Sequence, residues 1–241
     1  MDGNGRWAQR RHHPRVFGHV RGASRIKPVV REAERLGVKA LTLYAFSTEN
    51  WTRPEEELGV LWKILKKFLK READELDARN VRLRVIGELE RLGPDVREVL
   101  DPVIARLSKN TGLQLTFAVS YGSRREIARA ARLFAEDCVS GKRHPSDLQE
   151  RGDDLLEEYL WTADLGELAQ VDLVIRTSGE KRISNFLLWQ AAYAEFVFLD
   201  LCWPDFSPQD FEQAVVEYSN RDRRFGGLGQ KKELKTGGIR A

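Results

Sequence analysis

The chain of 241 residues is poor in cysteine and contains no long apolar run. Its two cysteines, Cys138 and Cys202, lie far apart without the spacing of a zinc site, so we expect both to be reduced and structural. No apolar stretch approaches the length of a membrane-spanning helix, and no signal peptide stands before the first motif. We therefore expect a cytoplasmic protein, with contact at a membrane surface left open.

Strong charge of one sign and the common nucleotide-binding motifs are also missing. The net charge of +3 is too small to argue for nucleic-acid binding. There is no Gly-x-x-x-x-Gly-Lys-Ser/Thr stretch, and no Gly-x-Gly-x-x-Gly follows a predicted strand, which disfavours a nucleotide-binding protein. The small net charge hides a basic first segment with no acid between Asp2 and Glu32. Six of its arginines are Arg6, Arg10, Arg11, Arg15, Arg21 and Arg25. A solvated basic arm or a nucleic-acid binder would explain these arginines but none of the features below.

What is present is the composition of a soluble globular protein, with 41% hydrophobic and 32% charged residues. Hydrophobic periodicity predicts helices over residues 24–36, 58–76, 96–107, 125–138 and 208–218. Pro28 should lie near the start of the first helix, and Gly37 should end it. Short apolar or alternating runs predict strands over residues 38–46, 81–86, 113–119, 171–175 and 196–199. This alternation predicts a single α/β domain with a mostly parallel central β-sheet flanked by helices.

Two segments have residues suited to phosphate. Residues 2–6 place one carboxylate beside a Gly-x-Gly turn and an arginine, and residues 172–186 place an arginine, a glycine turn, a second arginine and a serine after an apolar strand. Glycine allows close approach of the backbone, and arginine offers a forked donor to phosphate oxygens. A lone carboxylate suits a magnesium ion that bridges those oxygens. The pair of segments predicts an enzyme that handles two phosphorylated substrates.

Polar loops follow three of the predicted strands. They are residues 47–54, residues 120–125 and residues 176–179. Ligands of open α/β sheets bind beyond the carboxyl ends of the strands, so we expect the three loops to face one crevice.

Six ordered blocks carry a resemblance to a known family: residues 1–8, 17–19, 41–54, 172–190, 194–206 and 223–227. The chain resembles the cis-prenyltransferases, and most closely the bacterial undecaprenyl diphosphate synthases. The resemblance implies repeated condensation of isopentenyl diphosphate onto farnesyl diphosphate, with cis double bonds. The product would be undecaprenyl diphosphate or a similar long polyprenyl diphosphate, the lipid carrier of bacterial cell-wall synthesis. It also implies a domain over residues 1–225 and a flexible tail over residues 226–241. An apolar tunnel would run along the helix at 58–76, although such a helical face is also typical of plain core.

The resemblance assigns roles residue by residue. Asp2 would be catalytic and would bind Mg²⁺, with Glu195 as a second carboxylate at the metal. The allylic diphosphate would be held by Gly3, Asn4, Gly5, Arg6, Arg15 and His19. Isopentenyl diphosphate would be held by Arg176, Arg182 and Ser184. Further substrate-binding residues would be Trp7, Ile183, Ser47, Thr48, Glu49, Trp51 and Arg53. Arg224, Phe225 and Gly226 would reach the diphosphate site of a neighbouring subunit, which implies a homodimer.

The proton acceptor is less clear. The family's proposed acceptor corresponds to Asn50, but a neutral amide is a weak base. We therefore expect Asn50 to orient the substrate or to relay the proton. The bound diphosphate could itself take the proton from C2 of isopentenyl diphosphate. Trp51 could instead be a core aromatic residue.

The sequence departs from the family at three places. In the family an apolar strand runs into the catalytic aspartate, whereas here Met1 directly precedes Asp2; either the start lies inside a longer chain or this form lacks a central strand. Lys181 stands where relatives often have histidine or glutamine. Residues 120–123 stand where the family has a more glycine-rich loop. A non-catalytic partner subunit is the alternative function, but such subunits tend to lose the aspartate and the arginines that this chain keeps.

Overall fold

The computed structural model describes residues 1–221, which form two compact units. The first unit contains Met1–Leu41, Asp172–Lys181 and the described part of Ala194–Ala241, and the second contains Thr42–Val171 and Arg182–Tyr193. The chain therefore passes between the units several times, and the residues expected to be functional are distributed over both. Each unit is described by itself below.

The second unit is built on a three-stranded sheet. Its strands are β1 (Ala40–Ser47), β2 (Arg82–Ile86) and β3 (Gln114–Tyr121), in the order β1-β3-β2. β2 and β3 pair in parallel, with Arg82 opposite Gln114 and Ile86 opposite Ala118. Every residue of β3 is buried, as expected for a central strand that is covered on both faces.

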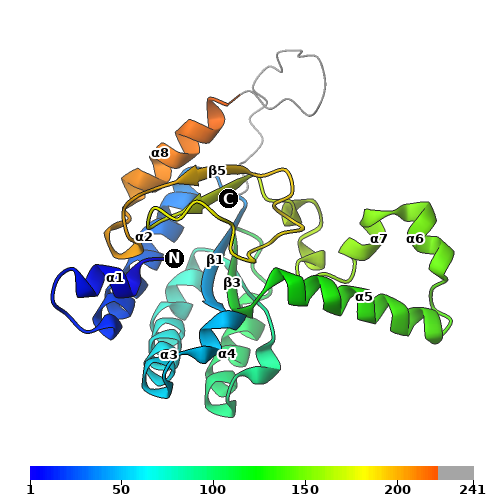
Figure 1. The fold of residues 1–241 in the computed structure, drawn as a ribbon, viewed down its shortest axis with the longest axis horizontal. Helices are drawn as coiled ribbons and strands as arrows, with labels where there is room; N and C mark the ends of the chain where they lie inside the picture. The colour runs from blue at the N-terminus through cyan, green and yellow to red at the C-terminus, as the bar shows by residue number, and fades with distance from the viewer. Residues whose placement is uncertain (222–241) are drawn as a thin grey trace. The chain divides into compact units, whose positions relative to one another are not determined.

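Two amphipathic helices of the second unit, α3 (Glu55–Ala78) and α4 (Pro94–Leu107), lie side by side (Figure 1). Phe68 of α3 packs edge-on against Phe117 of β3, with ring centroids 5.6 Å apart, so α3 covers the sheet with its apolar face. After β3 the chain forms α5 (Ser123–Val139), α6 (Pro145–Arg151) and α7 (Asp153–Glu157). Short 3₁₀ helices complete the unit: η1 (Thr48–Thr52), η2 (Leu89–Arg91) and η3 (Ala163–Ala169).

The first unit contains a two-stranded parallel sheet of β4 (Leu173–Arg176) and β5 (Glu195–Phe198). Around it are α1 (Asn4–Gln9), α2 (Arg15–Arg35), η4 (Trp203–Asp205) and α8 (Pro208–Ser219). Ser207 is the N-cap of α8, because its hydroxyl oxygen accepts the backbone N–H of Asp210 at 3.2 Å. α1 and η4 both contact α2, which makes α2 the central helix of this unit.

The α/β class, with parallel strands flanked by helices, is confirmed, while several element boundaries differ. α2 begins at Arg15 rather than near residue 24, so Pro28 lies inside the helix and not near its start; Gly37 follows the helix end as predicted, with φ of 75°. The alternation of arginine with apolar residues over 81–86 predicts that one face of β2 is more exposed to solvent, and Arg84 contradicts this prediction. That residue is 8% exposed, because its guanidinium pairs with Asp164 of η3 and donates to Thr116. The strands of residues 1–221 form two sheets, and α1, α6 and α7 were not predicted.

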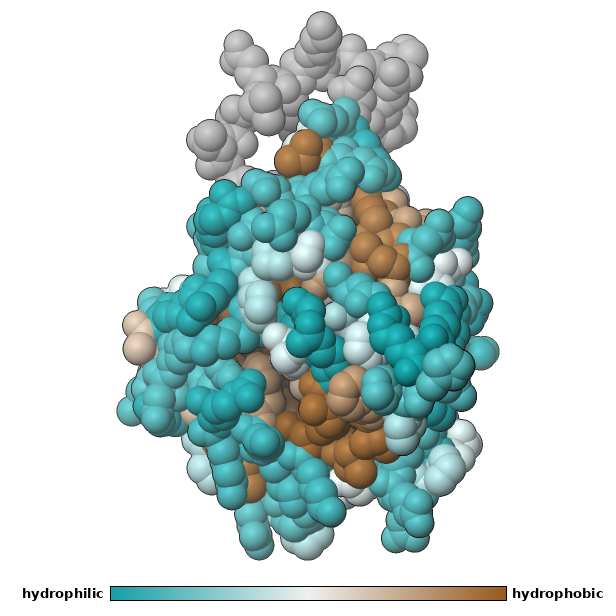
Figure 2. Space-filling view, turned by 90° about the vertical axis from the view of Figure 1, so that its left-hand side faces the viewer, coloured by the Kyte–Doolittle hydropathy of each residue, from teal (hydrophilic) through white to brown (hydrophobic). Residues whose placement is uncertain are grey.

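Polar side chains cover most of the face shown in Figure 2, with apolar ones gathered among them. Among the described residues, no helix is both long enough and apolar enough to cross a bilayer. The predicted tail over residues 226–241 lies outside the described part of the chain, and the domain limits of residues 1–225 stay a prediction, as does the tunnel.

Candidate functional site

The first unit holds Asp2 at the carboxyl end of β4, the place where open α/β sheets bind ligands. The backbone of Asp2 is fixed from both sides. Its N–H donates to Thr177 Oγ1 at 3.2 Å, and the Thr177 hydroxyl donates in turn to the Asp2 carbonyl oxygen at 3.1 Å. Trp203 N–H donates to the same carbonyl oxygen at 2.9 Å. Residues 2–6 and the loop after β4, 170 residues apart in the sequence, therefore meet in one site.

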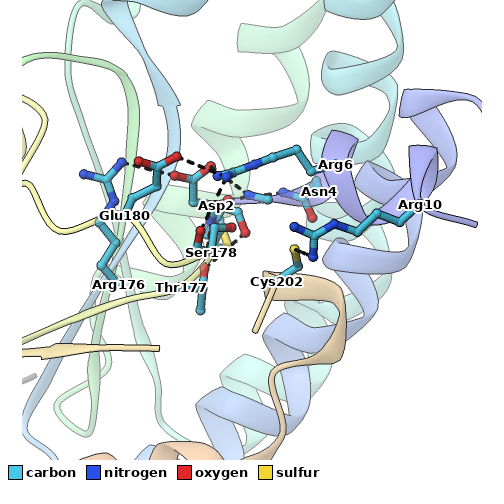
Figure 3. Close-up of polar contacts among 11 residues, drawn as sticks. Asp2, Asn4, Arg6, Arg10, Arg176, Thr177, Ser178, Glu180 and Cys202 are labelled. Carbon is cyan, nitrogen blue, oxygen red and sulfur yellow. Dashed lines mark hydrogen bonds and ion pairs between the residues drawn. The ribbon is translucent and has the colours of Figure 1, made fainter. Parts of the chain in front are cut away.

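Four side chains form what we call the Asp2 cluster: Asp2, Arg6, Arg176 and Glu180 (Figure 3). Asp2 Oδ2 accepts a hydrogen bond from Arg176 Nη2 at 3.1 Å, and Arg6 Nη2 lies 3.8 Å from Asp2 Oδ1. Arg6 Nη1 lies 3.1 Å from Glu180 Oε1. Carboxylates and arginines thus alternate along the series Glu180, Arg6, Asp2 and Arg176.

The Asp2 carboxyl group is ionised more readily than usual. Its burial acts to raise the pKa, but the hydrogen bonds from Arg176 and from Gly3 N–H, together with nearby positive charge, outweigh it and lower the pKa. Gly3 N–H lies 2.7 Å from Asp2 Oδ1. The side chain is still 41% exposed, so a ligand can reach a carboxylate whose geometry is already fixed.

Glycine is required at Gly3 and Gly5 for different reasons. Gly3 has φ of 90°, a conformation that costs other residues strain, and a Cβ there would lie 2.0 Å from Ser178 Oγ. At Gly5 a Cβ would lie 2.9 Å from Arg15 Cζ, because the Arg15 guanidinium group packs directly over the glycine. Both positions therefore require glycine for packing within the first unit, while the predicted close approach of this turn to a phosphate stays a prediction.

α1 crosses α2 at two glycines of α2. A Cβ on Gly18 would lie 1.9 Å from the Asn4 carbonyl oxygen, and one on Gly22 would lie 2.1 Å from Asn4 Oδ1. Asn4 Nδ2 donates to the Met1 carbonyl oxygen at 3.2 Å, so Asn4 bridges the start of the chain and α2. His19, also predicted to bind the allylic diphosphate, is half-buried on the same helix.

Trp7 is an anchor of α1. It is 7% exposed, and its indole N–H donates to Asp205 Oδ1 at 2.7 Å. The Arg11 guanidinium group stacks over the ring and lies 3.3 Å from Asp205 Oδ2. Trp7 therefore positions α1, and its contact with substrate stays a prediction.

The loop after β4 continues the hydrogen bonding of the sheet. Ser178 N–H donates to the Leu201 carbonyl oxygen at 2.7 Å, and Gly179 N–H donates to that of Leu199 at 2.9 Å. Ser178 has φ of 80°, and its Oγ is buried without a hydrogen-bond partner among the described residues. This hydroxyl, next to Gly3, is a donor that the sequence did not point out.

In the second unit, the predicted loop after β1 folds into η1. Ser47 N–H donates to Asn50 Oδ1 at 3.1 Å, so the Asn50 amide oxygen is already engaged by the backbone. Thr48 Oγ1 donates to Glu49 Oε2 at 3.2 Å, and Arg53 pairs with Glu57 of α3 at 3.0 Å.

Trp51 joins η1 to the carboxyl end of β3. Its indole N–H donates to Ser120 Oγ at 2.9 Å, and its ring packs on Phe46 and Trp62 at 5.2 and 5.5 Å between centroids. The segments at residues 47–54 and 120–125 therefore contact each other, while the crevice that they would line stays a prediction. The loop after β4 belongs to the other unit, and its place beside them stays a prediction.

The segment after the second predicted arginine also lies in this unit. Arg182 and Ser184 are exposed and Ile183 is half-buried. Ser184 and Asn185 have φ of 51° and 59°. Such consecutive left-handed conformations are uncommon outside glycine, although asparagine tolerates them well. Asn185, which follows these predicted phosphate ligands, donates from Nδ2 to Glu49 Oε1 at 2.9 Å.

The second predicted metal carboxylate, Glu195, occupies a different end of the β4–β5 pair from Asp2. Glu195 opens β5 opposite Leu173, whereas Asp2 lies beyond Arg176, which is opposite Phe198. Three residues of strand separate these ends by about 10 Å. Glu195 Oε2 accepts a hydrogen bond from Arg221 Nη1 at 2.8 Å. Within one chain the two carboxylates do not share a site. The predicted intersubunit residues Arg224, Phe225 and Gly226 lie outside the described residues.

Sequence reasoning missed three residues of these sites: Ser178, Glu180 and Asn185. All three stand inside the segment 172–190 that was recognised. Their partners Gly3, Arg6 and Glu49 come from distant segments, so only the order of the blocks could have pointed to them.

Comparisons with known proteins agree with this geometry. Residues 1–226 match the family model described as "Putative undecaprenyl diphosphate synthase". The isoprenyl transferase of Clostridium perfringens is 46% identical over 228 residues, which cover 95% of this chain and 88% of that protein. The isoprenyl transferase of Geobacter sulfurreducens is 48% identical over 226 residues, which cover 94% of this chain and 89% of that protein.

Solved structures are similar over most of the chain. The lavandulyl diphosphate synthase of Lavandula x intermedia, solved with dimethylallyl diphosphate, has a TM-score of 0.90 and 32% identity, covering 94% of this chain and 95% of that one. A probable undecaprenyl diphosphate synthase of Campylobacter jejuni has a TM-score of 0.74 and 33% identity, covering 86% and 92%. Since the family model spans nearly the whole chain and the Asp2 cluster is intact, this chain belongs to the undecaprenyl diphosphate synthase family of prenyltransferases.

Proposed function

We propose that this chain condenses isopentenyl diphosphate repeatedly onto farnesyl diphosphate, forming each new double bond in the cis configuration. Undecaprenyl diphosphate or a similar long polyprenyl diphosphate would be the product, serving as lipid carrier for cell-wall synthesis. Family membership gives the reaction class, and the Asp2 cluster is the observation that carries the proposal. A non-catalytic partner subunit is disfavoured, because the aspartate and the arginines that catalysis would need are all present.

The allylic diphosphate would bind at the Asp2 cluster. Arg6 pairs with Glu180, and Arg176 pairs with Asp2. An entering diphosphate would replace part of these ion pairs with contacts between the arginines and its phosphate oxygens. Arg15 and His19 of α2 would add hydrogen-bond donors or positive charge. The first backbone N–H groups of α1, which have no acceptor within the helix, would add further donors. As the allylic C–O bond breaks, fixed arginines stabilise the charge that develops on the leaving diphosphate.

Asp2 is the residue that would hold magnesium. Mg²⁺ usually binds through one or two carboxylates and completes its shell with water and substrate phosphates. The Asp2 carboxylate fits, since its pKa is lowered and the bonds from Gly3 and Arg176 use only part of the roughly four lone-pair directions of a carboxylate. Within residues 1–221 no group of three or more His, Cys, Asp or Glu could hold the ion without substrate. When bound, the metal would withdraw charge from the leaving diphosphate. Glu195 would reach the metal only from a position other than the one it has here, where it is hydrogen-bonded to Arg221.

Isopentenyl diphosphate would bind through Arg176, Arg182 and Ser184, with Ile183 and the η1 loop against its hydrocarbon part. After the new C–C bond forms, a proton must leave C2. The Asn50 amide oxygen accepts Ser47 N–H, which supports an orienting role for Asn50. The diphosphate, an anion bound nearby, would then take the proton.

The same proposal includes a homodimer in which Arg224, Phe225 and Gly226 reach the neighbouring site. The chain would work in the cytoplasm and touch the inner membrane face when it releases its lipid product. The growing product would extend along the apolar side of α3, where Phe68, Leu69 and Leu76 are buried.

A product assay with farnesyl diphosphate, labelled isopentenyl diphosphate and Mg²⁺ tests the proposal on the parent and on Asp2→Ala. Since the metal contribution amounts to several kcal/mol, we expect Asp2→Ala to lower kcat about 10²- to 10³-fold. Asp101→Ala removes an exposed carboxylate paired with Arg97 on α4 and should keep the parent rate. A chelator should abolish product formation, and added Mg²⁺ should restore it.

Two results would contradict the proposal. A parent chain that makes no lipid product under any of these conditions would move the assignment to the non-catalytic partner subunit. An Asp2→Ala variant as fast as the parent would remove Asp2 from the mechanism.

A further inference from the structure

Asn185 joins three separate parts of the second unit. Its carbonyl oxygen accepts Ser123 N–H at 2.8 Å, and its Oδ1 accepts Arg124 N–H at 2.8 Å, so it occupies the N-terminal end of α5. Its Nδ2 donates to Glu49 Oε1 of η1 at 2.9 Å. One side chain therefore ties the segment at residues 182–185 to both a long helix and the loop after β1.

The packing around Asn185 leaves little freedom. A Cβ on Gly122 would lie 2.8 Å from Asn185 Nδ2 and 2.6 Å from Thr48 Oγ1. Ser123 Oγ accepts the N–H of Leu188 at 2.9 Å and fixes the segment again three residues later. The left-handed φ of 59° at Asn185 is thus held by contacts on both sides.

Glu49 is held as an anion that faces Asn185. Partial burial acts to raise its pKa, but the hydrogen bond from Asn185, with those from its own backbone, Ser47 and Thr48, outweighs it and lowers the pKa. The carboxylate therefore accepts from the Asn185 amide throughout the neutral range.

We propose that Asn185 is a positioning residue that sets the distance between the two halves of the isopentenyl diphosphate site, through its bond to Glu49. This rests on the proposed function. On one side of the Asn185–Glu49 bond stand Arg182 and Ser184, which would bind the diphosphate. On the other stands Asn50, next to Glu49, which would orient the substrate for proton loss. Asn185 itself does not touch the substrate.

The test is a donor exchange. Asn185→Asp keeps the acceptor for Arg124 N–H but places a second carboxylate oxygen against Glu49, so the two should repel. We expect the KM for isopentenyl diphosphate to rise and kcat to fall, so that kcat/KM for this substrate drops about tenfold or more. The KM for farnesyl diphosphate should stay within twofold. Adding Glu49→Gln supplies an amide donor from the opposite side. N185D/E49Q should recover most of the loss, and E49Q alone should lose less than N185D.

Asn80 offers a matched control. It also has φ of 58°, its Oδ1 accepts Thr111 N–H at 2.9 Å and its Nδ2 donates to Thr111 Oγ1 at 3.0 Å, before β2 and outside the predicted sites. Asn80→Asp makes the same chemical change and should move neither KM.

The outcomes separate cleanly. N185D kinetics equal to those of an active parent, or a loss that E49Q does not recover, would overturn the inference. If thermal melting shows that N185D does not fold, Asn185→Gly keeps the left-handed φ, removes the donor to Glu49 and should raise the KM for isopentenyl diphosphate. Unchanged kinetics in Asn185→Gly would then overturn the inference. A parent without activity would count against the proposed function, and titration of isopentenyl diphosphate binding to the same variants would still decide the role of Asn185.

Discussion

At the scale of single residues, Gly3 controls where the Asp2 carboxylate lies. It turns the chain from Asp2 into α1 with φ of 90°, and its N–H donates to Asp2 Oδ1. Because Ser178 Oγ occupies the space where a Cβ would stand, no other residue fits without moving the loop after β4. The position of the carboxylate that we propose to be catalytic thus depends on a neighbour with no side chain.

Gly3→Ala should therefore lose more than backbone freedom. We expect kcat to fall at least about tenfold and the free energy of unfolding to drop by about 2–4 kcal/mol, from left-handed strain plus overlap with Ser178. Gly37→Ala is the matched control. Gly37 has φ of 75° with nothing within 4 Å of its Cβ position, so the substitution should cost about 1–2 kcal/mol and leave kcat unchanged.

Denaturant unfolding and steady-state assays of both alanine variants measure these effects. Equal losses of stability in the two variants, with a normal kcat for Gly3→Ala, would show that the loop adapts. Adding Ser178→Gly to Gly3→Ala should restore part of the stability, since it removes the overlapping atom.

At the scale of elements, α2 shows how packing overrides local sequence preference. Two buried glycines, Gly18 and Gly22, and an internal Pro28 all disfavour a helix, yet α2 runs unbroken from Arg15 to Arg35. The glycines let α1 approach closely, which explains why the helix begins nine residues before the predicted start. Contacts with α1 and η4 stabilise α2, which the local sequence alone would disfavour as a helix.

Pro28→Ala should strengthen this helix. The substitution restores a backbone hydrogen bond and removes the ring clash, so the free energy of unfolding should rise by about 1–3 kcal/mol. The melting temperature should rise by roughly 2–4 °C for each kcal/mol. Pro94→Ala is the control, because Pro94 is the first residue of α4, a position that favours proline. If Pro28→Ala melts at or below the parent temperature, the proline fits α2 better than its missing N–H suggests.

The sequence was informative where function follows a local pattern. Apolar runs that end in polar residues predicted a strand over 38–46, found as β1 (Ala40–Ser47), and one over 171–175, found as β4 (Leu173–Arg176). The partners across the site were beyond its reach: Asn185 and Glu49 are 136 residues apart, and Arg6 meets Glu180 from the other end of the chain. Such pairs follow from tertiary packing, which leaves no mark in either segment alone.

At the scale of the whole molecule, the predicted homodimer makes a claim about which chain supplies which residue. If Arg224 serves the neighbouring site, a site needs Asp2 from one chain and Arg224 from the other. Asp2→Asn and Arg224→Ala homodimers should each be nearly inactive. Mixed and exchanged, they should form heterodimers in which one of the two sites has both residues intact.

The mixture should therefore regain activity, up to about half the parent rate per heterodimer. Assays after co-refolding, compared with each variant refolded alone, measure the recovery. Arg224 acting within its own chain predicts no recovery, because every site would then lack one residue.

The hydrogen bonds of Ser178 and Gly179 to Leu201 and Leu199 bear on the thermodynamics of binding. Ordering a loose loop costs about 1–2 kcal/mol of entropy for each residue fixed. Here the residues beside Asp2 are already fixed to the β5 side of the fold, so a diphosphate that arrives does not have to freeze them. Its binding free energy can go into contacts with Arg6 and Arg176, and little of it is lost to conformational entropy of the backbone.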